Sequence, residues 1–340
     1  MAVITNSNNN LTLADWAKRT DPEGRVALVA ELLSQSNEIL EDCVFKEGNL
    51  PTGDRVVVRT GLPTAYWRSL NQGIPNSKST TAQVDEACGM LEARSEVDKD
   101  LAMLNGNTAQ FRLSEDNAFL EAMNQTQAST MFYGNPATDP KQFLGLATRY
   151  SSTTAGNGTN IISGGSTSGA LNTSVYLVVW GDNTVYCPFP KGSKAGLVHE
   201  DLGEQTVYDG VNRMQAYATR YQWKSGLVVK DWRYVVRIPN LLVADVVAGT
   251  GTQAASAATQ LTKLMMRAMY KIPNLDSGRA AFYMNRTVHS GLAVQSLDRS
   301  QAALAVQPAL SQFGTARNYL SFQGIPIRRV DCLLNTEAVV

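Results

Sequence analysis

Residues 254–297 decide the fold class and read A-A-S-A-A-T-Q-L-T-K-L-M-M-R-A-M-Y-K-I-P-N-L-D-S-G-R-A-A-F-Y-M-N-R-T-V-H-S-G-L-A-V-Q-S-L. Apolar residues in the first half recur at the i, i+3, i+4, i+7, i+8 spacing of a helix with one buried face: Leu261, Leu264, Met265, Ala268 and Met269. Pro273 ends that helix because proline has no backbone N–H to donate. The apolar run 280–284 then predicts a buried strand that begins after a glycine turn, and a second helix follows. The stretch therefore predicts a compact α/β unit.

Length and charge limit the possible functions. The 340 residues are enough for about two domains of ~150 residues each. Lys plus Arg and Asp plus Glu each number 30, so the chain has no basic excess for wrapping nucleic acid. Residues 1–50 hold eight acidic and four basic side chains, and residues 205–240 hold two and six. These segments could attract each other within one chain or between copies, although a solvated surface explains them equally well.

Cysteine spacing and hydropathy indicate a soluble protein of a reducing compartment. The four cysteines lie far apart and form no C-x-x-C, so the sequence predicts neither a zinc site nor a disulfide framework. The N-terminus lacks the pattern of a signal peptide, and no stretch approaches the ~18 apolar residues of a membrane span. We expect no contact with a membrane.

The N-terminal segment predicts two amphipathic helices, at residues 11–18 and 25–40, separated by Pro22-Glu23-Gly24. Their apolar faces need a partner in the same chain or in another copy. The candidate contact residues are Leu13, Trp16, Val29 and Leu33.

A long loop joins two predicted strands, residues 55–60 and a second near residues 80–91. About eighteen residues without periodicity lie between them, and a loop of that length is usually functional. Its aromatic and apolar side chains indicate a surface that another molecule covers. The alternative is that Trp67 folds back onto its own core. The candidate contact residues are Arg59, Tyr66, Trp67, Arg68, Leu70 and Ile74.

The middle of the chain predicts one long helix and two pairs of strands. Residues 111–133 carry an interrupted apolar stripe, with Ser114 as a plausible N-cap. Residues 151–169, rich in Ser, Thr, Gly and Asn, predict a flexible loop or a surface insertion. Residues 175–180 and 184–187 predict a β-hairpin.

Residues 214–238 predict a long antiparallel strand pair that turns at residues 224–226. This is the most aromatic part of the chain, with basic residues between the aromatic ones. Such a surface near Trp223 can bind single-stranded nucleic acid, but cross-strand pairing within a sheet is the more common reason for the pattern.

The strongest enzyme-like pattern is a predicted strand at residues 241–248 followed by G-x-G-x-x-A from Gly249 and Gly251 to Ala254. A dinucleotide site uses such a turn, so a nucleotide-dependent oxidoreductase is the alternative function. The next strand ends on Asn285 and lacks the acidic residue that holds a ribose. We favour a hinge at Gly249 and Gly251 between two domains.

Other catalytic and metal-binding patterns are missing from the sequence. His199 and His289 are the two histidines, and neither lies in a metal-binding motif. No G-x-S-x-G, H-E-x-x-H or G-x-x-x-x-G-K-[ST] occurs. The sequence predicts no enzyme, no catalytic residue, no metal and no cofactor.

The order of these motifs resembles the major capsid proteins of tailed double-stranded-DNA bacteriophages, which share the Hong Kong 97-like fold, in its podovirus-type branch. The segment S-G-R-A-A-F-Y-M-N-R-T-V-H-S-G-L looks like the strand and helix of the axial domain, and G-I-P-I-R from Gly324 like its later strand. The segment N-L-P-T-G-D-R-V-V-V-R-T-G-L-P-T-A-Y-W-R looks like the start of the extended E-loop. Residues 111–133 look like the spine helix. The resemblance covers nearly the whole chain.

The resemblance implies an α+β capsid fold with the following parts: N-terminal arm 1–47, E-loop 48–96, peripheral domain 97–150 with spine helix 111–133, hairpin or loop insertion 151–195, long peripheral strands 196–245 and axial domain 246–340. It implies a major capsid protein that self-assembles, through hexamers and pentamers, into an icosahedral shell around a phage double-stranded-DNA genome. Its implied partners are scaffold and portal proteins, a decoration or cement protein, and packaged DNA on the inner face without sequence specificity. Assembly would take place in the cytoplasm of the bacterial host, and the product is the virion.

Strand order departs from the family pattern. The long peripheral strands usually finish the chain, whereas here they precede the axial unit, so we hypothesise a permuted version of the fold. Lys78 lies in the E-loop, yet nothing marks an asparagine partner for it, so we predict no covalent cross-link. We also expect no fused helical scaffold at the N-terminus.

Overall fold

The computed structural model describes residues 11–19, 33–167, 171–209, 212–247, 252–295, 304–310 and 316–340. The helices in these residues are α1 Leu13–Lys18, α2 Ile39–Asp42, α3 Lys99–Met103, α4 Thr108–Tyr133, α5 Leu146–Arg149, α6 Val243–Val247, α7 Thr252–Lys271 and α8 Arg286–Gln295, with 3-10 turns η1 Leu104–Gly106, η2 Gly158–Asn160, η3 Trp232–Tyr234 and η4 Leu275–Ser277. The strands are β1 Phe45–Glu47, β2 Gly53–Gly61, β3 Thr80–Ala87, β4 Gly89–Asp98, β5 Asn172–Trp180, β6 Val185–Phe189, β7 Leu197–Asp209, β8 Asn212–Ser225, β9 Val228–Val229, β10 Val235–Leu242, β11 Arg279–Met284, β12 Leu304–Leu310, β13 Ala316–Phe322 and β14 Ile325–Arg329. None of the helices in this part of the chain has the length and apolar character needed to cross a membrane.

The chain divides into two compact units, each made of discontinuous segments. Unit 1 is Met1–Gln35, Met90–Gln127 and Gly196–Lys224. Unit 2 is Ser36–Gly89, Ala128–Ala195 and Ser225–Val340. Helix α4 contributes its first part to unit 1 and its last turns to unit 2.

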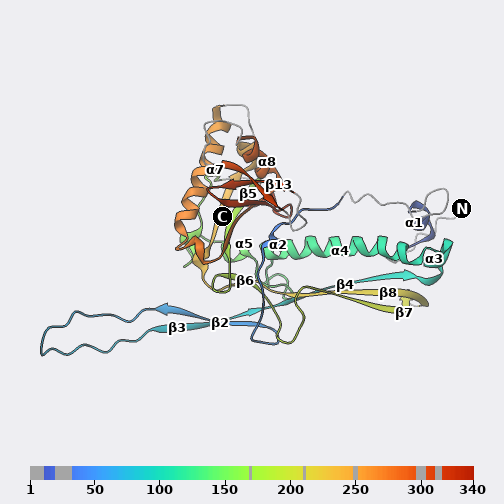
Figure 1. The fold of residues 1–340 in the computed structure, drawn as a ribbon, viewed down its shortest axis with the longest axis horizontal. Coiled ribbons are helices and arrows are strands. Elements are labelled where there is room, and N and C mark those ends of the chain that lie inside the picture. Colours follow the sequence, from blue (N-terminus) through green and yellow to red (C-terminus); the bar gives the residue numbers. More distant parts are fainter. Residues whose placement is uncertain are drawn as a thin grey trace. The chain divides into compact units, whose positions relative to one another are not determined.

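Unit 1 is a helix on a three-stranded sheet. Its strands have the order β4-β8-β7, and α4 runs beside them (Figure 1). Val97, Leu101 and Phe111 are buried together, and Trp16 of α1 packs against them. An ion pair between Arg112 and Asp201, 2.8 Å apart, ties α4 to β7.

Unit 2 is a large mixed sheet with a core on each face. Among the described residues nine strands join it, in the order β1-β6-β5-β11-β14-β13-β12, with β10 paired to β5 and β9 to β6. All nine residues of β5 are buried. Because successive side chains of a strand point to opposite faces, β5 supplies both cores.

One face of this sheet carries α7 and α8. Val175, Leu177 and Val179 of β5 lie in this core with Leu261, Met265 and Val288, among others. The apolar residues at helical spacing in residues 254–297 are therefore those that α7 and α8 bury against the sheet. The sequence of helix, 3-10 turn, buried strand and helix is confirmed in α7, η4, β11 and α8.

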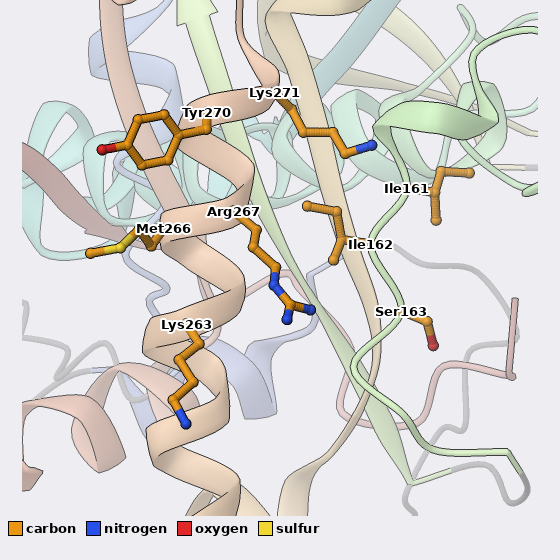
Figure 2. Close-up of a pocket in the computed structure, with 8 residues that line it drawn as sticks. All are labelled: Ile161, Ile162, Ser163, Lys263, Met266, Arg267, Tyr270 and Lys271. Atoms are coloured by element: carbon orange, nitrogen blue, oxygen red, sulfur yellow. The ribbon is translucent and has the colours of Figure 1, made fainter.

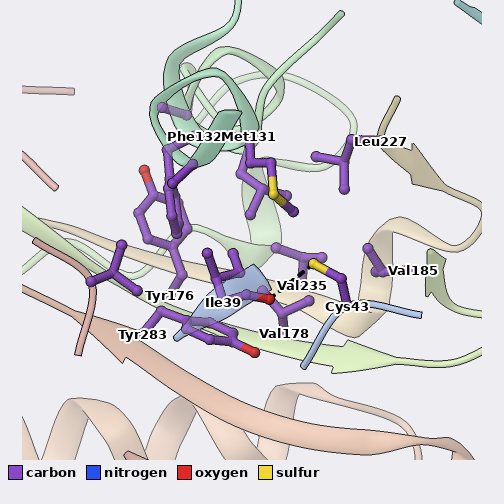
Figure 3. Packing of buried hydrophobic residues seen from close by; sticks show 14 of the residues in the cluster. Ile39, Cys43, Met131, Phe132, Tyr176, Val178, Val185, Leu227, Val235 and Tyr283 are labelled. Atoms are coloured by element: carbon purple, nitrogen blue, oxygen red, sulfur yellow. Dashed lines mark hydrogen bonds between the residues drawn. The ribbon is translucent and has the colours of Figure 1, made fainter. Parts of the chain in front are cut away.

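The other face buries side chains from the last part of the predicted N-terminal arm, which belongs to unit 2 from Ser36 onward. Ile39 and Cys43 lie among Met131, Phe132 and Tyr176 (Figure 3). Polar groups fix the same segment, since the buried carboxylate of Asp42 accepts hydrogen bonds from Arg328 at 2.9 and 3.0 Å and from the Tyr283 hydroxyl at 2.9 Å. The end of α4 and residues 36–47 are thus part of the main sheet's core.

Two predicted strand pairs are wrong. Strands β5 and β6 touch through one parallel pair, Trp180 with Val185, and form no hairpin, because β5 pairs along its length with β10 and β11. The chain does not turn back on itself at residues 224–226 either. Strand β8 pairs with β7 in unit 1, whereas β10 joins the main sheet of unit 2. Apolar runs in the sequence identify strands, but they do not determine which strands pair with each other.

Several element boundaries also differ from the prediction. Helix α4 begins at Thr108, and Ser114 lies inside it, where its hydroxyl donates to the carbonyl of Phe111 at 2.8 Å instead of capping the helix. Residues 33–38 are not helical, so the predicted second arm helix keeps only Ile39 and Leu40, in α2, within the described residues. The predicted loop 151–169 is partly packed, since Asn160 is buried and donates to the carbonyl of Val235 at 2.9 Å.

Candidate assembly surfaces

The E-loop is a two-stranded ribbon with an exposed tip. Strands β2 and β3 pair antiparallel from Gly53 with Ala87 to Gly61 with Thr80, and Figure 1 shows the chain continuing beyond them as an extended loop. Pro63 and Pro75 flank the tip, residues 62–79, and have no N–H to donate to a ladder. Every residue of the tip is exposed.

Charged and polar contacts hold the base of the ribbon. Arg55 donates to both carboxylate oxygens of Asp85 across the strands, at 2.6 and 2.7 Å, and this hydrogen bond lowers the pKa of Asp85. Arg149 makes the same two-pronged contact with Glu86, at 2.6 Å for each bond, in a partly buried position. The ribbon is therefore fixed at its base and free at its tip.

The tip exposes large apolar side chains together. Trp67 is fully exposed at 105%, Leu70 at 95% and Leu62 at 79%, and Tyr66 and Ile74 are about half exposed. The alternative that Trp67 folds onto its own core is wrong. A cluster of this kind marks an interaction surface because burying each such side chain is worth about 1.5–3 kcal/mol.

The tip carries positive charge without any acidic residue. Arg68 and Lys78 are exposed within it, Arg59 is exposed at its border, and residues 59–79 contain no Asp or Glu. The structure records no ion pair for these three cations among the residues it describes. All six predicted E-loop contact residues therefore lie on one exposed segment. Leu62 is a further exposed apolar residue of the tip that was not predicted, because its place between the strand end and Pro63 gave no periodic signal.

The N-terminal arm residues divide between a packed helix and an exposed segment. Thr12 and Asp15 form a capping box at the start of α1, and the Thr12 hydroxyl lowers the pKa of Asp15. Trp16 packs on the core of unit 1, whereas Leu13 is 64% exposed. Leu33 is also exposed, and its carbonyl accepts a hydrogen bond from Gln125 at 2.7 Å. Val29 lies outside the described residues.

The residues proposed for a nucleotide site or hinge are only partly described. Gly249 and Gly251 lie outside the described residues, as does the side chain of Ala254. The preceding segment is the end of β10 followed by helix α6, Val243–Val247, so the predicted strand 241–248 is wrong. A dinucleotide turn needs a strand immediately before its first glycine, and the chain has a helix there.

The surroundings of the two histidines do not indicate a catalytic or metal-binding role. His199 stacks on the ring of Tyr221 with centroids 5.2 Å apart. Burial lowers the pKa of His289, and the nearby Arg329 lowers it further. Within the described part of the chain, no three His, Cys, Asp or Glu side chains come together as metal ligands.

The sheet, the long helix and the extended ribbon match a solved capsid. A near-atomic structure of bacteriophage Epsilon15 is similar over 100% of this chain and 99% of its own, with 30% identity and a TM-score of 0.72. The bacteriophage JBD30 capsid matches over 89% of this chain and 92% of its own, with 9% identity and a TM-score of 0.47, which is too low to support a conclusion. A comparison with curated protein sequences found no match. The protein is thus a phage capsid protein of mixed α/β structure with the Hong Kong 97-like fold.

The sequence also matches the model of a protein family. The model described as Major capsid protein GP7 matches residues 21–340, and the chain belongs to this family. The protein is therefore a structural component of the virion, and copies of it form the shell of a phage head. The expected class of protein is confirmed.

Proposed function

We propose that the E-loop tip binds a neighbouring copy of the chain in the shell, and that the exposed residues of the N-terminal arm add a second contact. The exposed tip carries the proposal, because Trp67 and Leu70 meet almost no atoms of their own chain. Burying these two side chains would contribute about 3–6 kcal/mol to one contact. A shell repeats the contact many times, so each one can remain weak.

The base of the ribbon supports this role. The paired contacts of Arg55 with Asp85 and of Arg149 with Glu86 fix the direction in which the tip leaves unit 2. A prearranged arm loses less conformational entropy on binding than a free one.

The experiment replaces residues 62–79 by Asn-Gly, which closes a two-residue hairpin after the last ladder pair, Gly61 with Thr80. We expect a folded subunit with an unchanged thermal midpoint that forms no shells in negative-stain microscopy of protein purified with its scaffold. The matched control is Gln72→Ala with Asn76→Ala, which keeps every apolar side chain of the tip. Normal shells from the shortened chain would refute the proposal, and the thermal midpoint of the unassembled subunit checks that the shortened chain has folded.

The strand order also belongs to the proposal. We infer that β7 and β8 are peripheral strands placed ahead of the axial unit, which comprises α7, β11 and α8. Their sheet with β4 and their place in the same unit as most of α4 support this. Residues 225–238 are excluded from the permuted segment, because β10 pairs with β5 in the sheet that contains β11.

The remaining partners follow from the needs of a closed, filled head. We propose hexamers and pentamers as building blocks, scaffold and portal proteins during assembly in the host cytoplasm, and a decoration protein on the finished shell. Contact with packaged DNA would lack sequence specificity. The net charge of zero agrees with weak, non-specific contact, because a protein that wraps DNA carries a basic excess.

A further inference from the structure

A groove of about 760 Å³ lies beside α7 in unit 2. One wall is the helix surface with Lys263, Met266, Arg267, Tyr270 and Lys271, and the facing segment is residues 161–163. Figure 2 shows Arg267 and Lys271 directed toward that segment, with Met266 and Tyr270 on the adjoining side of the helix. The groove thus combines a cationic side with an apolar one.

The cations of the groove form a stripe along α7. Lys263, Arg267 and Lys271 are spaced at i, i+4 and i+8, so they share one face of the helix. All three are exposed, and α7 contains no acidic residue. Lys271 donates to the carbonyl of Thr159, but the structure records no ion pair for any of the three within the residues it describes.

Most cations of unit 1 are paired within that unit. Unit 1 has eight basic residues in its described part, and six of them form ion pairs inside the unit: Lys18, Arg19, Arg94, Lys99, Arg112 and Arg220. By contrast, helix α7 has three cations without a recorded ion pair among the described residues, and it contains no acidic residue. Its positive charge is left for another molecule.

The two units carry opposite charge. Unit 1 contains 15 acidic and 9 basic residues, and unit 2 contains 15 acidic and 21 basic residues, giving net charges of −6 and +6. Because the internal ion pairs of unit 1 use most of its cations, its excess negative charge remains available. The surface complementary to the groove is thus present on every copy of the chain.

The apolar part of the groove distinguishes between two polyanions. Tyr270 is 84% exposed, and Met266 and Ile162 are partly exposed beside it. A phosphate backbone would be bound by the cations alone. An acidic protein surface that also carries apolar side chains would use both halves of the groove, as does unit 1 with exposed Met103 and Leu104 next to Asp98 and Asp100.

We propose that the groove formed by α7 and residues 161–163 binds the acidic surface of unit 1 in a neighbouring copy of this chain. The inference rests on the proposed assembly and assigns it a further contact, independent of the E-loop and of the N-terminal arm. The contact joins unlike surfaces, so it can propagate around a ring of subunits. Its strength falls as salt rises, because exposed charges are screened.

Photo-crosslinking identifies the occupant of the groove. A benzophenone amino acid replaces Tyr270, and this chain is assembled with isotope-labelled copies that lack the probe. We expect mass spectrometry to find the probe joined to labelled peptides from residues 90–127 or 196–224. Crosslinks confined to unit 2 peptides, crosslinks to DNA, or crosslinks within one copy alone would overturn the proposal.

Charge reversal tests the energetics. We expect Lys263→Glu with Arg267→Glu to raise the subunit concentration needed for assembly about tenfold at 50 mM NaCl and to flatten its dependence on NaCl up to 500 mM. Lys191→Glu with Lys194→Glu is the matched control, because it changes the same charge at exposed positions of unit 2 outside the groove. Assembly of the groove variant at the wild-type concentration would contradict the proposal, as would normal assembly with reduced DNA retention.

These outcomes are distinct from failure of the E-loop proposal. If the shortened E-loop variant assembles normally but the groove variant does not, the tip proposal is wrong and the groove proposal stands. The reverse result rejects the groove alone. Thermal midpoints of the unassembled variants show whether each has folded.

Discussion

Large apolar residues of this protein either pack in its core or stand exposed on its surface, and the two tryptophans Trp67 and Trp180 show the difference. Trp67 is fully exposed at the end of an arm, whereas Trp180 is buried and donates its ring N–H to the Tyr283 hydroxyl at 2.7 Å. Composition does not distinguish the two tryptophans. The long aperiodic loop around Trp67 indicated a surface that another molecule covers, but it left open that Trp67 folds back onto its own core.

Glu337 fixes the C-terminal segment in the core of unit 2. Its carboxylate accepts hydrogen bonds from Arg237 at 2.9 Å, from Ser174 and from the Tyr133 hydroxyl. Arg237 also donates to the carbonyls of Ala147 and Tyr150. Strands β5 and β10, the end of α4 and the turn after α5 thus meet at one buried ion pair.

We expect Glu337→Gln to lower the free energy of unfolding of the unassembled subunit by about 3 kcal/mol, because it leaves the Arg237 charge buried without a counter-ion. Urea unfolding measures this. Glu41→Gln is the control: Glu41 is exposed, and its change should stay within about 0.5 kcal/mol. A loss below about 1 kcal/mol for Glu337→Gln would mean that Arg237 finds another partner or water.

At the scale of elements, local pattern predicted helices and strands, and long-range pairing decided their partners. The α7–β11–α8 unit was predictable because helical periodicity, a proline stop and an apolar run agree within 44 residues. The partners of β5, β8 and β10 were not predictable. Their apolar residues fit any neighbouring strand: β8 pairs with the preceding strand β7, whereas β5 pairs with β10 and β11, which lie far away in the sequence.

Close packing between β5 and the start of β11 depends on Gly278. A Cβ atom there would lie 2.2 Å from the Trp180 carbonyl oxygen, so the backbone would have to move. We expect Gly278→Ala to destabilise the unassembled subunit by about 1–3 kcal/mol, measured by urea unfolding. Gly156→Ala, where a Cβ meets nothing within 4 Å, should be neutral within about 0.5 kcal/mol. Equal stability of the two variants would contradict this account of the β5–β11 contact.

At the scale of the whole molecule, the chain separates charge between its two units while its total stays at zero. The sequence showed local excesses in residues 1–50 and 205–240, but each of these segments is divided between the two units. The structure regroups the charges into unit 1 and unit 2. The proposed contact between the groove on α7 and the surface of unit 1 depends on this separation of charge between the two units.

The structure around Gly249 and the family of the protein argue against the alternative function, a nucleotide-dependent oxidoreductase. Helix α6 stands where a dinucleotide site needs a strand, and the chain belongs to a capsid family. We expect titration of the protein with NAD or with ATP, followed by calorimetry, to give no saturable binding. Saturable binding that is lost in Gly249→Val with Gly251→Val would show that the turn does hold a nucleotide.

The sequence alone determined the class of fold, the α7–β11–α8 unit and the long loop between β2 and β3, because these depend on periodicity, proline positions and the order of motifs. Only the tertiary structure decided which strands share a sheet, that Trp67 is free of its own core, and that Lys263, Arg267 and Lys271 face a groove without a counter-ion. Pairing, exposure and charge balance depend on neighbours that are distant in sequence. Residues 254–297 have a regular pattern, but the residues that pair with them and surround them in the fold lie elsewhere in the chain.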